Sequence, residues 1–387
     1  MTPILPGATI GLLGGGQLGR MTALAARAMG YDIVVLDPDP HPPAGPLASQ
    51  CITARFDDVA AATRLAEMAD VVTLEIERIA PAGLVAASEF APVRPSAKVL
   101  EIVGDRARQK EWLVSQGAPV GAYATVSSVA ECRQVVERFG VSYVKAATGG
   151  YDGRGQVRVT APDECAEAWA ALRATRCVVE QAVDLVAEIS VLVARRPKGE
   201  TAVYPPALNV HEAGQLAWSA IPARIDPGMA ERATELAVGL AEALGVVGLL
   251  AVEMFIAADG RLLVNELAPR PHNSFHHTIE ACVTSQFEQL VRAVCDLPLG
   301  DTAIVTPAAI ANILGDAWHG SVPPDFAAAL TVPGTRLHLY GKKEARPARK
   351  MGHLAAIGDT TEEAIRRVME ALARLGVGDP TAGGRAV

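Results

Sequence analysis

The sequence predicts a mixed protein, part α/β and part α+β, with a doubly wound parallel-sheet domain at the N-terminus, a central domain and a small C-terminal domain. Two observations lead to this prediction. Short apolar strands alternate with helical patterns over the first hundred residues, which favours a parallel sheet with right-handed crossovers. Beyond about residue 105 the pattern changes to strands separated by turns, which is typical of antiparallel sheet. We therefore place the domains at residues 1–104, 105–300 and 301–387.

Strands and one clear helix can be assigned within the first domain. Apolar runs at 9–13, 33–36 and 71–74 predict strands, and the apolar spacing over 17–29 predicts a helix between the first two. A break at 92–96 precedes another helical stretch. We take this break as the end of the domain.

The rest of the chain carries four further helical patterns. In the central domain they cover 163–173, 229–244 and 284–296. The last segment has short strands and one clear helix, which Thr360 and Glu363 introduce with the spacing of a capping box.

The composition indicates an enzyme with a large core. Half of the 387 residues are hydrophobic (50%) and 20% are charged. A net charge of −8 and an aromatic content of 4% disfavour nucleic acid as a partner, because phosphates need cations and base stacking needs rings. The six scattered cysteines are expected to be reduced, and we find neither a signal-peptide pattern nor an apolar stretch long enough for a bilayer. We therefore expect a cytoplasmic protein without membrane contact.

A first glycine-rich segment, 14–19, fits the pattern G-x-G-x-x-G between a strand and a helix, with Asp37 about twenty residues further on. This is the fingerprint of dinucleotide binding, in which backbone amides approach an anion closely. It favours nicotinamide or flavin binding, and an NAD-dependent dehydrogenase is one hypothesis. The alternative is that the glycines only permit tight packing of strand on helix.

A second glycine-rich segment, 148–156, follows a predicted strand that ends at Lys145. Its amides could fold over phosphates, and the Lys145 ammonium would reach the same phosphates as a point charge. No G-K-[ST] follows, so the segment is not a P-loop. The alternative is a surface hairpin without a ligand.

Two apolar runs joined around Asp259 and Gly260 predict a β-hairpin. A two-residue turn there would place Glu253 directly opposite Glu266. Like charges so placed are destabilising unless they are bridged, and carboxylate oxygens suit Mg²⁺ carried by a nucleotide, with Asn265 assisting. A shared proton, or a Glu253 that simply turns to solvent, are the alternatives.

Two polar segments follow the hairpin. The run 268–277 comes directly after a strand end, and Arg270 is its best candidate for anion recognition. The run 341–350 holds five cations in an acidic protein, which indicates either a phosphate clamp or an ordinary solvated loop.

Taken together, these segments resemble the ATP-grasp ligases of purine biosynthesis, and most closely the N5-carboxyaminoimidazole ribonucleotide synthetase family. The resemblance covers almost the whole chain. Its motifs are Gly14-Gly15-Gly16-Gln17-Leu18-Gly19, Asp105-Arg106 with Gln109-Lys110, Gly150-Tyr151-Asp152-Gly153-Arg154-Gly155-Gln156, Asn265 to Ser274, and Ser285-Gln286-Phe287-Glu288. It implies a pre-ATP-grasp domain, an ATP-grasp domain with a lid subdomain at about 120–180, and a C-terminal domain that completes the substrate site.

The resemblance implies an activity. ATP and bicarbonate would carboxylate the exocyclic amine of 5-aminoimidazole ribonucleotide by way of carboxyphosphate, releasing ADP and phosphate on the route to IMP. ATP would bring Mg²⁺, and a homodimer is implied. A formate-dependent glycinamide ribonucleotide transformylase, which has a segment similar to Glu75-Ile76-Glu77, and a non-catalytic nucleotide sensor are the alternatives within this superfamily. The 150–156 lid resembles the carboxylating family.

The resemblance also implies roles for individual residues. ATP would contact the phosphate-binding, lid, hinge and ribose positions, namely Arg106, Lys145, Gly150, Tyr151, Asp152, Gly153, Arg154, Gly155, Gln156, Glu180, Gln181, Ala182, Val183, Glu188, His211, Asn265 and Glu266. Glu253 and Glu266 would hold Mg²⁺. The ribonucleotide would contact Gln17, Leu18, Glu75, Asn273, Lys343, Arg349 and Lys350. Arg270 and Asn273 would be catalytic, Arg270 by stabilising carboxyphosphate.

Five residues depart from the family pattern, namely Arg78, Ala147, Phe275, His277 and Ala348. The bulk of Phe275 beside the site predicts a different local backbone or a reshaped pocket. None of the five removes an expected phosphate or metal ligand.

Overall fold

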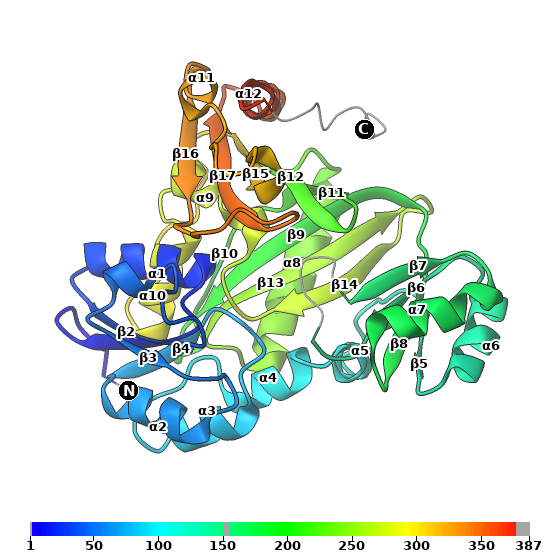
Figure 1. Cartoon of the computed structure of the whole chain (residues 1–387), viewed down its shortest axis with the longest axis horizontal. Coiled ribbons are helices and arrows are strands. Elements are labelled where there is room, and N and C mark those ends of the chain that lie inside the picture. The colour runs from blue at the N-terminus through cyan, green and yellow to red at the C-terminus, as the bar shows by residue number, and fades with distance from the viewer. Residues whose placement is uncertain (1, 150–154, 377–387) are drawn as a thin grey trace.

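The computed structural model describes residues 2–149 and 155–376. A large sheet runs through the middle of the molecule, with the N-terminal domain on one side of it and a small sheet on the other (Figure 1). Within the described ranges, no helix is long and apolar enough to cross a membrane. All six cysteines are free thiols, as predicted.

The N-terminal domain is a parallel sheet covered on both faces. Its elements are β1 (Thr9–Leu13), α1 (Gln17–Ala28), β2 (Asp32–Asp37), β3 (Gln50–Thr53), α2 (Val59–Glu67), β4 (Val71–Leu74), α3 (Pro81–Ala87) and α4 (Ala97–Val103). The strand order is β3-β2-β1-β4, with parallel pairing throughout. Successive residues of β2 point to opposite faces, so Ile33 packs with Ala23 of α1 while Val34 packs with Leu65 of α2. The predicted doubly wound sheet is confirmed.

The small sheet is antiparallel and lies beyond helix α5 (Arg106–Ser115). Its elements are β5 (Tyr123–Val126), α6 (Val129–Phe139), β6 (Ser142–Ala146), β7 (Gln156–Val159), α7 (Cys165–Leu172) and β8 (Cys177–Gln181). The order is β5-β8-β6-β7, and a core around Val144 and Val179 packs against α6 and α7. The glycine-rich segment connects β6 to β7.

The large sheet is also antiparallel. Its first part consists of β9 (Leu185–Arg195), β10 (Thr201–Val203), β11 (Ala207–Glu212), β12 (Gln215–Ile221), β13 (Gly248–Ala257) and β14 (Leu262–Ala268), with helices α8 (Pro227–Leu244), α9 (Thr278–Ala281) and α10 (Gln286–Val294). Leu250 and Val252 of β13 face α8, whereas Leu249 and Ala251 face α10. This alternation buries β13 on both sides and fixes the strand that carries Glu253.

The C-terminal strands continue the same sheet. The elements are β15 (Ala308–Leu314), α11 (Phe326–Ala329), β16 (Thr335–Leu339), β17 (Lys350–Ile357) and α12 (Thr361–Arg374), and the order runs β14-β13-β9-β11-β12-β15-β17-β16. Helix α12 packs on β15 and β17 through Ala364 and Val368. The basic segment 341–350 therefore connects two strands at the end of the sheet that lies above the N-terminal domain (Figure 1).

Local predictions agree with the structure in most places and differ in three. The Thr360 hydroxyl accepts a hydrogen bond from the Glu363 amide, as a capping box requires, although the Glu363 carboxylate reaches the Asp359 amide instead of that of Thr360. Helix α7 begins only at Cys165, after a 3-10 turn at Pro162–Glu164. Strand β3 was not predicted, because only Ile52 in it is buried and no alternation marks it.

Candidate active site

The β13–β14 hairpin places Glu253 directly opposite Glu266, as predicted, but the turn is longer than expected. The Ala257 amide donates to the Arg261 carbonyl, so the loop holds three residues and not two. A bulge at Asn265 compensates: Met254 pairs with Val264, whereas Glu253 pairs with Glu266. The register at the carboxylates is therefore produced by the bulge.

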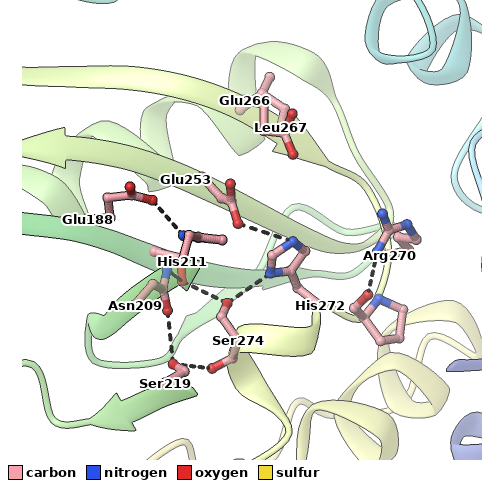
Figure 2. Close-up of polar contacts among 12 residues, drawn as sticks. Glu188, Asn209, His211, Ser219, Glu253, Glu266, Leu267, Arg270, His272 and Ser274 are labelled. Carbon is pink, nitrogen blue, oxygen red and sulfur yellow. Dashed lines mark hydrogen bonds and ion pairs between the residues drawn. The ribbon is translucent and has the colours of Figure 1, made fainter. Parts of the chain in front are cut away.

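The Glu253 side chain is buried, so the alternative in which it turns to solvent is wrong. Burial and then the Glu266 charge raise the pKa of Glu253 to about 7. His272 Nε2 lies 3.4 Å from Glu253 Oε1, and His211 Nδ1 lies 2.6 Å from Glu188 Oε2 (Figure 2). Burial would lower the pKa of His211, but the hydrogen bond with Glu188 and the nearby Glu253 charge raise it overall.

Two lysines and a glutamate form a buried cluster beside the hairpin. Glu180 on β8 lies 3.0 Å from Lys145 Nζ and 3.2 Å from Lys110 Nζ. Burial would raise the pKa of Glu180, but the two ammonium charges outweigh it and lower that pKa to about 2. Glu180 was expected at the adenine hinge, and the structure places its side chain with these lysines.

Other predicted nucleotide residues converge on the same place. Arg106 Nη2 lies 4.0 Å from Glu266 Oε2, and Lys145 Nζ lies 3.5 Å from the Asn265 side-chain oxygen. Lys110 was not among the predicted site residues. Its spacing of four residues from Arg106 puts both side chains on one face of α5, which was the available signal.

The structure describes the hinge fully and the lid only in part. Gly150, Tyr151, Asp152, Gly153 and Arg154 lie outside the described residues. The two lid residues that are described, Gly155 and Gln156, pair with the end of β6, where the Gly155 carbonyl accepts from Ala146 and Gln156 lies opposite Lys145. The hinge residues Gln181, Ala182 and Val183 cross from the small sheet to the large one, and the Ala182 amide donates to the Val141 carbonyl.

A buried polar network extends from Glu253 into the core, and sequence reasoning missed it. His272 Nδ1 lies 2.8 Å from the Ser274 hydroxyl, which lies 2.8 Å from that of Ser190. Asn209 donates to Ser190 and accepts from Ser219, whose hydroxyl oxygen also lies 2.9 Å from the Ser274 carbonyl oxygen (Figure 2). The signal was the presence of polar residues inside otherwise apolar strands.

Arg270 and Asn273 lie on the loop after β14. Arg270 Nε lies 2.6 Å from Glu77 Oε1, which joins this loop to the N-terminal domain. Asn273 is 7% exposed, and its two amide atoms find no hydrogen-bond partner among the described residues. A buried, unsatisfied carboxamide is costly, which fits a group that completes its hydrogen bonds with a ligand.

Phe275 and His277 do not line the site. Both are fully buried, and Phe275 packs against Tyr204 and His277 with ring centroids 6.1 and 5.7 Å apart. Their side chains point into the core, so the expected reshaping of the pocket by Phe275 bulk is not seen.

The first glycine-rich segment is occupied by a side chain of the protein itself. The Glu75 carboxylate accepts hydrogen bonds from the Gly16 and Gly19 amides, and the Asp37 carboxylate accepts one from Gly15. A Cβ at Gly16 would lie 2.5 Å from Glu75 Oε1, so the glycines make room for this carboxylate. A pyrophosphate would find these amides taken, which contradicts the dehydrogenase hypothesis.

The basic segment meets this loop. Lys342 Nζ donates to the Gln17 side chain at 2.8 Å and to the Lys350 carbonyl at 2.6 Å. Lys350 is buried, and Arg349 donates to the Glu344 carbonyl. Lys342 was missed because residue type alone does not rank five neighbouring cations.

Two predicted substrate residues, Lys343 and Leu18, are less closely involved where the basic segment contacts the first glycine-rich segment. Lys343 is exposed. The Leu18 side chain packs with Met21, Phe287 and Tyr340, which leaves only its backbone for a ligand.

Family models match the chain in three consecutive segments. They are a ribonucleotide synthetase preATP-grasp domain over residues 7–104, an ATP-grasp domain over 111–287, and a phosphoribosylaminoimidazole carboxylase C-terminal domain over 308–367. The three matches follow one another in the order that the resemblance implied.

Relatives match over nearly the full length. N5-carboxyaminoimidazole ribonucleotide synthase of Bacillus subtilis is 41% identical over 367 residues, which cover 94% of this chain and 95% of the relative. The structure of the Thermotoga maritima synthetase has a TM-score of 0.86 at 39% identity, covering 95% of this chain and 98% of that one. The Aspergillus clavatus enzyme, solved with ADP and 5-aminoimidazole ribonucleotide, has a TM-score of 0.87 at 32% identity with the same coverage. The chain therefore belongs to the N5-carboxyaminoimidazole ribonucleotide synthase family of ATP-grasp ligases.

Proposed function

We propose that this chain uses ATP and bicarbonate to carboxylate the exocyclic amine of 5-aminoimidazole ribonucleotide, releasing ADP and phosphate in purine biosynthesis. The observation that carries the proposal is the convergence of three groups on one place: the Glu253–Glu266 pair, the Lys110–Lys145 cluster and the Arg270 loop. Family membership and the ligands of the Aspergillus clavatus relative support it.

Mg²⁺ would be held by Glu253 and Glu266. Two opposed carboxylates, one of them buried, fit a divalent cation, because an oxygen-ligated cation offsets both the burial and the Glu266 repulsion that raise the pKa of Glu253. Among the described residues no group of three or more His, Cys, Asp or Glu side chains could hold an ion alone, so the remaining ligands would come from the triphosphate. The bound cation would neutralise charge on the transferring phosphoryl group.

The nucleotide would lie between the small and large sheets. Arg106 and Lys145 carry the charge for its phosphates, and the 150–156 lid would cover them. The hinge 180–183 would face the adenine, Glu188 the ribose, and His211 would complete the site beside Glu253.

The ribonucleotide would lie where the N-terminal and C-terminal segments meet. Gln17, Glu75 and the Leu18 backbone would contact it from one side. Lys343, Arg349 and Lys350 would bind its 5′-phosphate from the other, where Lys342 already joins the two segments.

The chemistry would proceed in two steps. A bicarbonate oxygen attacks the γ-phosphorus of ATP, ADP leaves, and carboxyphosphate forms near Arg270, whose guanidinium would stabilise its charge. The amine nitrogen then attacks the carboxyl carbon, phosphate leaves, and the nitrogen loses a proton. The Asn273 amide would orient the amine, because both its donor and its acceptor are available in a buried place.

Some properties follow from the resemblance and from family membership. We propose a homodimer, which light scattering after size exclusion would test. We propose a cytoplasmic location and a division into domains at 1–104, 105–300 and 301–387, which the family matches at 7–104, 111–287 and 308–367 support.

The test is ADP release from Mg·ATP in bicarbonate buffer, with and without 5-aminoimidazole ribonucleotide. Glycinamide ribonucleotide with formate is run in parallel. Release that depends on the aminoimidazole supports the proposal. Release that depends only on the formate pair, or on neither acceptor, would refute it.

A further inference from the structure

Strand β14 ends the order of the large sheet in the described part of the chain, so its outer edge faces no further strand. This edge carries Glu266 and the bulge at Asn265. This edge pairs only through an isolated bridge between Val264 and Val120. An edge of this kind next to a bulge is weakly constrained, because the ladder is interrupted on one side and reduced to one bridge on the other. The position of Glu266 therefore depends on what holds this edge.

Gln109 of α5 takes the place of a neighbouring strand. Its carboxamide oxygen accepts from the Leu267 amide at 3.0 Å, and its nitrogen lies 3.4 Å from the Leu267 carbonyl. The same nitrogen donates to the Val103 carbonyl at 3.2 Å, which fixes the orientation of the carboxamide. The side chain is only 4% exposed. Gln109 thus satisfies both backbone groups of the residue that follows Glu266.

The backbone before Glu266 is held as well. Lys110 Nζ donates to the Asn265 carbonyl at 3.0 Å, and the Val264 amide donates to the Pro119 carbonyl at 2.7 Å. Figure 1 shows α5 beside β14 at the junction with the small sheet. The bulge is therefore held on both sides by groups from one segment, 109–119.

We propose that Gln109 is a positioning residue for the metal site: it holds the outer edge of β14 so that Glu266 stays opposite Glu253. The inference rests on the proposed function, in which these carboxylates bind Mg²⁺. Gln109 acts through the Leu267 backbone. Lys110 supports the same backbone but also contacts Glu180 in the nucleotide cluster, so its replacement would be harder to interpret.

The experiment compares Gln109→Met with Gln116→Met, a control at the exposed C-terminal end of the same helix. Calorimetry gives the dissociation constant of ADP with saturating Mg²⁺ and again in EDTA. Gln109→Met should weaken Mg·ADP binding about tenfold, as loss of a group that orients a metal ligand does. ADP binding in EDTA should change less than twofold for both variants.

Glu266→Gln and the double variant separate the possible failures. Glu266→Gln should lower the Mg²⁺ dependence of ADP binding, and adding Gln109→Met should lower it little further, because both act on one group. If Glu266→Gln has no effect, the metal assignment fails and the inference with it. If Glu266→Gln has an effect and Gln109→Met has none, or weakens binding equally in EDTA, the inference alone is overturned.

Hydrogen exchange tests the role of Gln109 on the unmodified protein, so the result does not depend on whether a variant folds. The Leu267 amide should be strongly protected, although it faces the outer edge of the sheet. Exchange at the rate of an exposed amide would overturn the proposal.

Discussion

Acidification from pH 7.5 to 5.5 should destabilise the ligand-free protein, because His276, His277 and His353 are fully buried as neutral rings. Burial lowers the pKa of all three, that of His277 to about 3. The hydrogen bonds agree with a neutral His276. Gln286 Nε2 donates to the His272 carbonyl, which identifies this atom as the carboxamide nitrogen. The same nitrogen lies 3.0 Å from His276 Nδ1 and therefore donates to it. A proton on that nitrogen would meet a donor.

The size of the effect follows from proton linkage. The unfolded chain binds protons at an ordinary histidine pKa of about 6.5 and the folded chain does not, so each ring costs about 1.4 kcal/mol over this range. Three rings give about 4 kcal/mol. His272, whose pKa burial also lowers, adds to this loss, whereas His211, whose pKa is raised overall, acts in the opposite direction. Glu253 acts in the opposite direction: its pKa of about 7 makes the folded state take up a proton, which offsets about 2 kcal/mol. The net loss of about 2 kcal/mol corresponds to a Tm lower by about 2–3 °C.

Thermal unfolding in EDTA at constant ionic strength measures this at pH 7.5, 6.5 and 5.5. Glu253→Gln removes the offset, so its Tm should fall by about 5 °C over the same range. In His353→Gln, the part of the fall in Tm that comes from the buried histidines should be smaller by about a third. His319 is exposed, so His319→Gln should behave like the unmodified protein. An equal fall in the unmodified protein and in Glu253→Gln would refute the assignment of Glu253. A Tm of Glu253→Gln that is independent of pH would refute that of the histidines.

Three substitutions test the proposed catalytic groups. Glu266→Gln should lower Mg·ATP turnover at least about 100-fold while Tm changes little, and near-normal turnover would remove the metal assignment. Lys350→Ala should raise the KM for the ribonucleotide more than that for ATP, because the Lys350 charge is proposed to bind the 5′-phosphate of the ribonucleotide. An equal rise in both KM values would contradict this assignment of Lys350. Glu77→Gln should lower kcat about tenfold with little change in the KM for ATP, since Glu77 holds Arg270 at 2.6 Å; an unchanged kcat would show that Arg270 needs no partner.

The sequence predicted the domains and the strands that have a strong periodicity. It also predicted the pairing of Glu253 with Glu266, but from a turn length that was wrong. The turn after β13 has one residue more than the dipeptide Asp259-Gly260 indicates, and the bulge at Asn265 restores the register. A bulge depends on neighbouring segments, here Gln109 and Lys110 from a helix more than 150 residues away in the chain. Local patterns hold no information about such contacts.

Residues that act through long-range contacts were the ones that sequence reasoning missed. Lys110 was recognised only as part of a motif. The network from His272 to Ser219 was not predicted, because each member is an ordinary polar residue until the fold brings them together. Glu77 is visible as a charge in the sequence, but its partner Arg270 lies in another domain. Residue type and spacing identify groups that bind ligands directly, but they do not identify groups that orient other groups.

The first glycine-rich segment shows why its pattern alone misleads about function. The amides of Gly16 and Gly19 and the positive end of α1 would suit an anion, and here that anion is the Glu75 carboxylate of the protein itself. Because Glu75 already takes up these donors, the phosphate of a ligand needs cations from elsewhere. The β16–β17 connection carries such cations, and its Lys342 contacts Gln17 directly. In the proposed ribonucleotide site, the loop that would bind a dinucleotide in another protein would thus be completed by a C-terminal segment more than 300 residues away, which returns to the N-terminal domain at the Lys342–Gln17 contact.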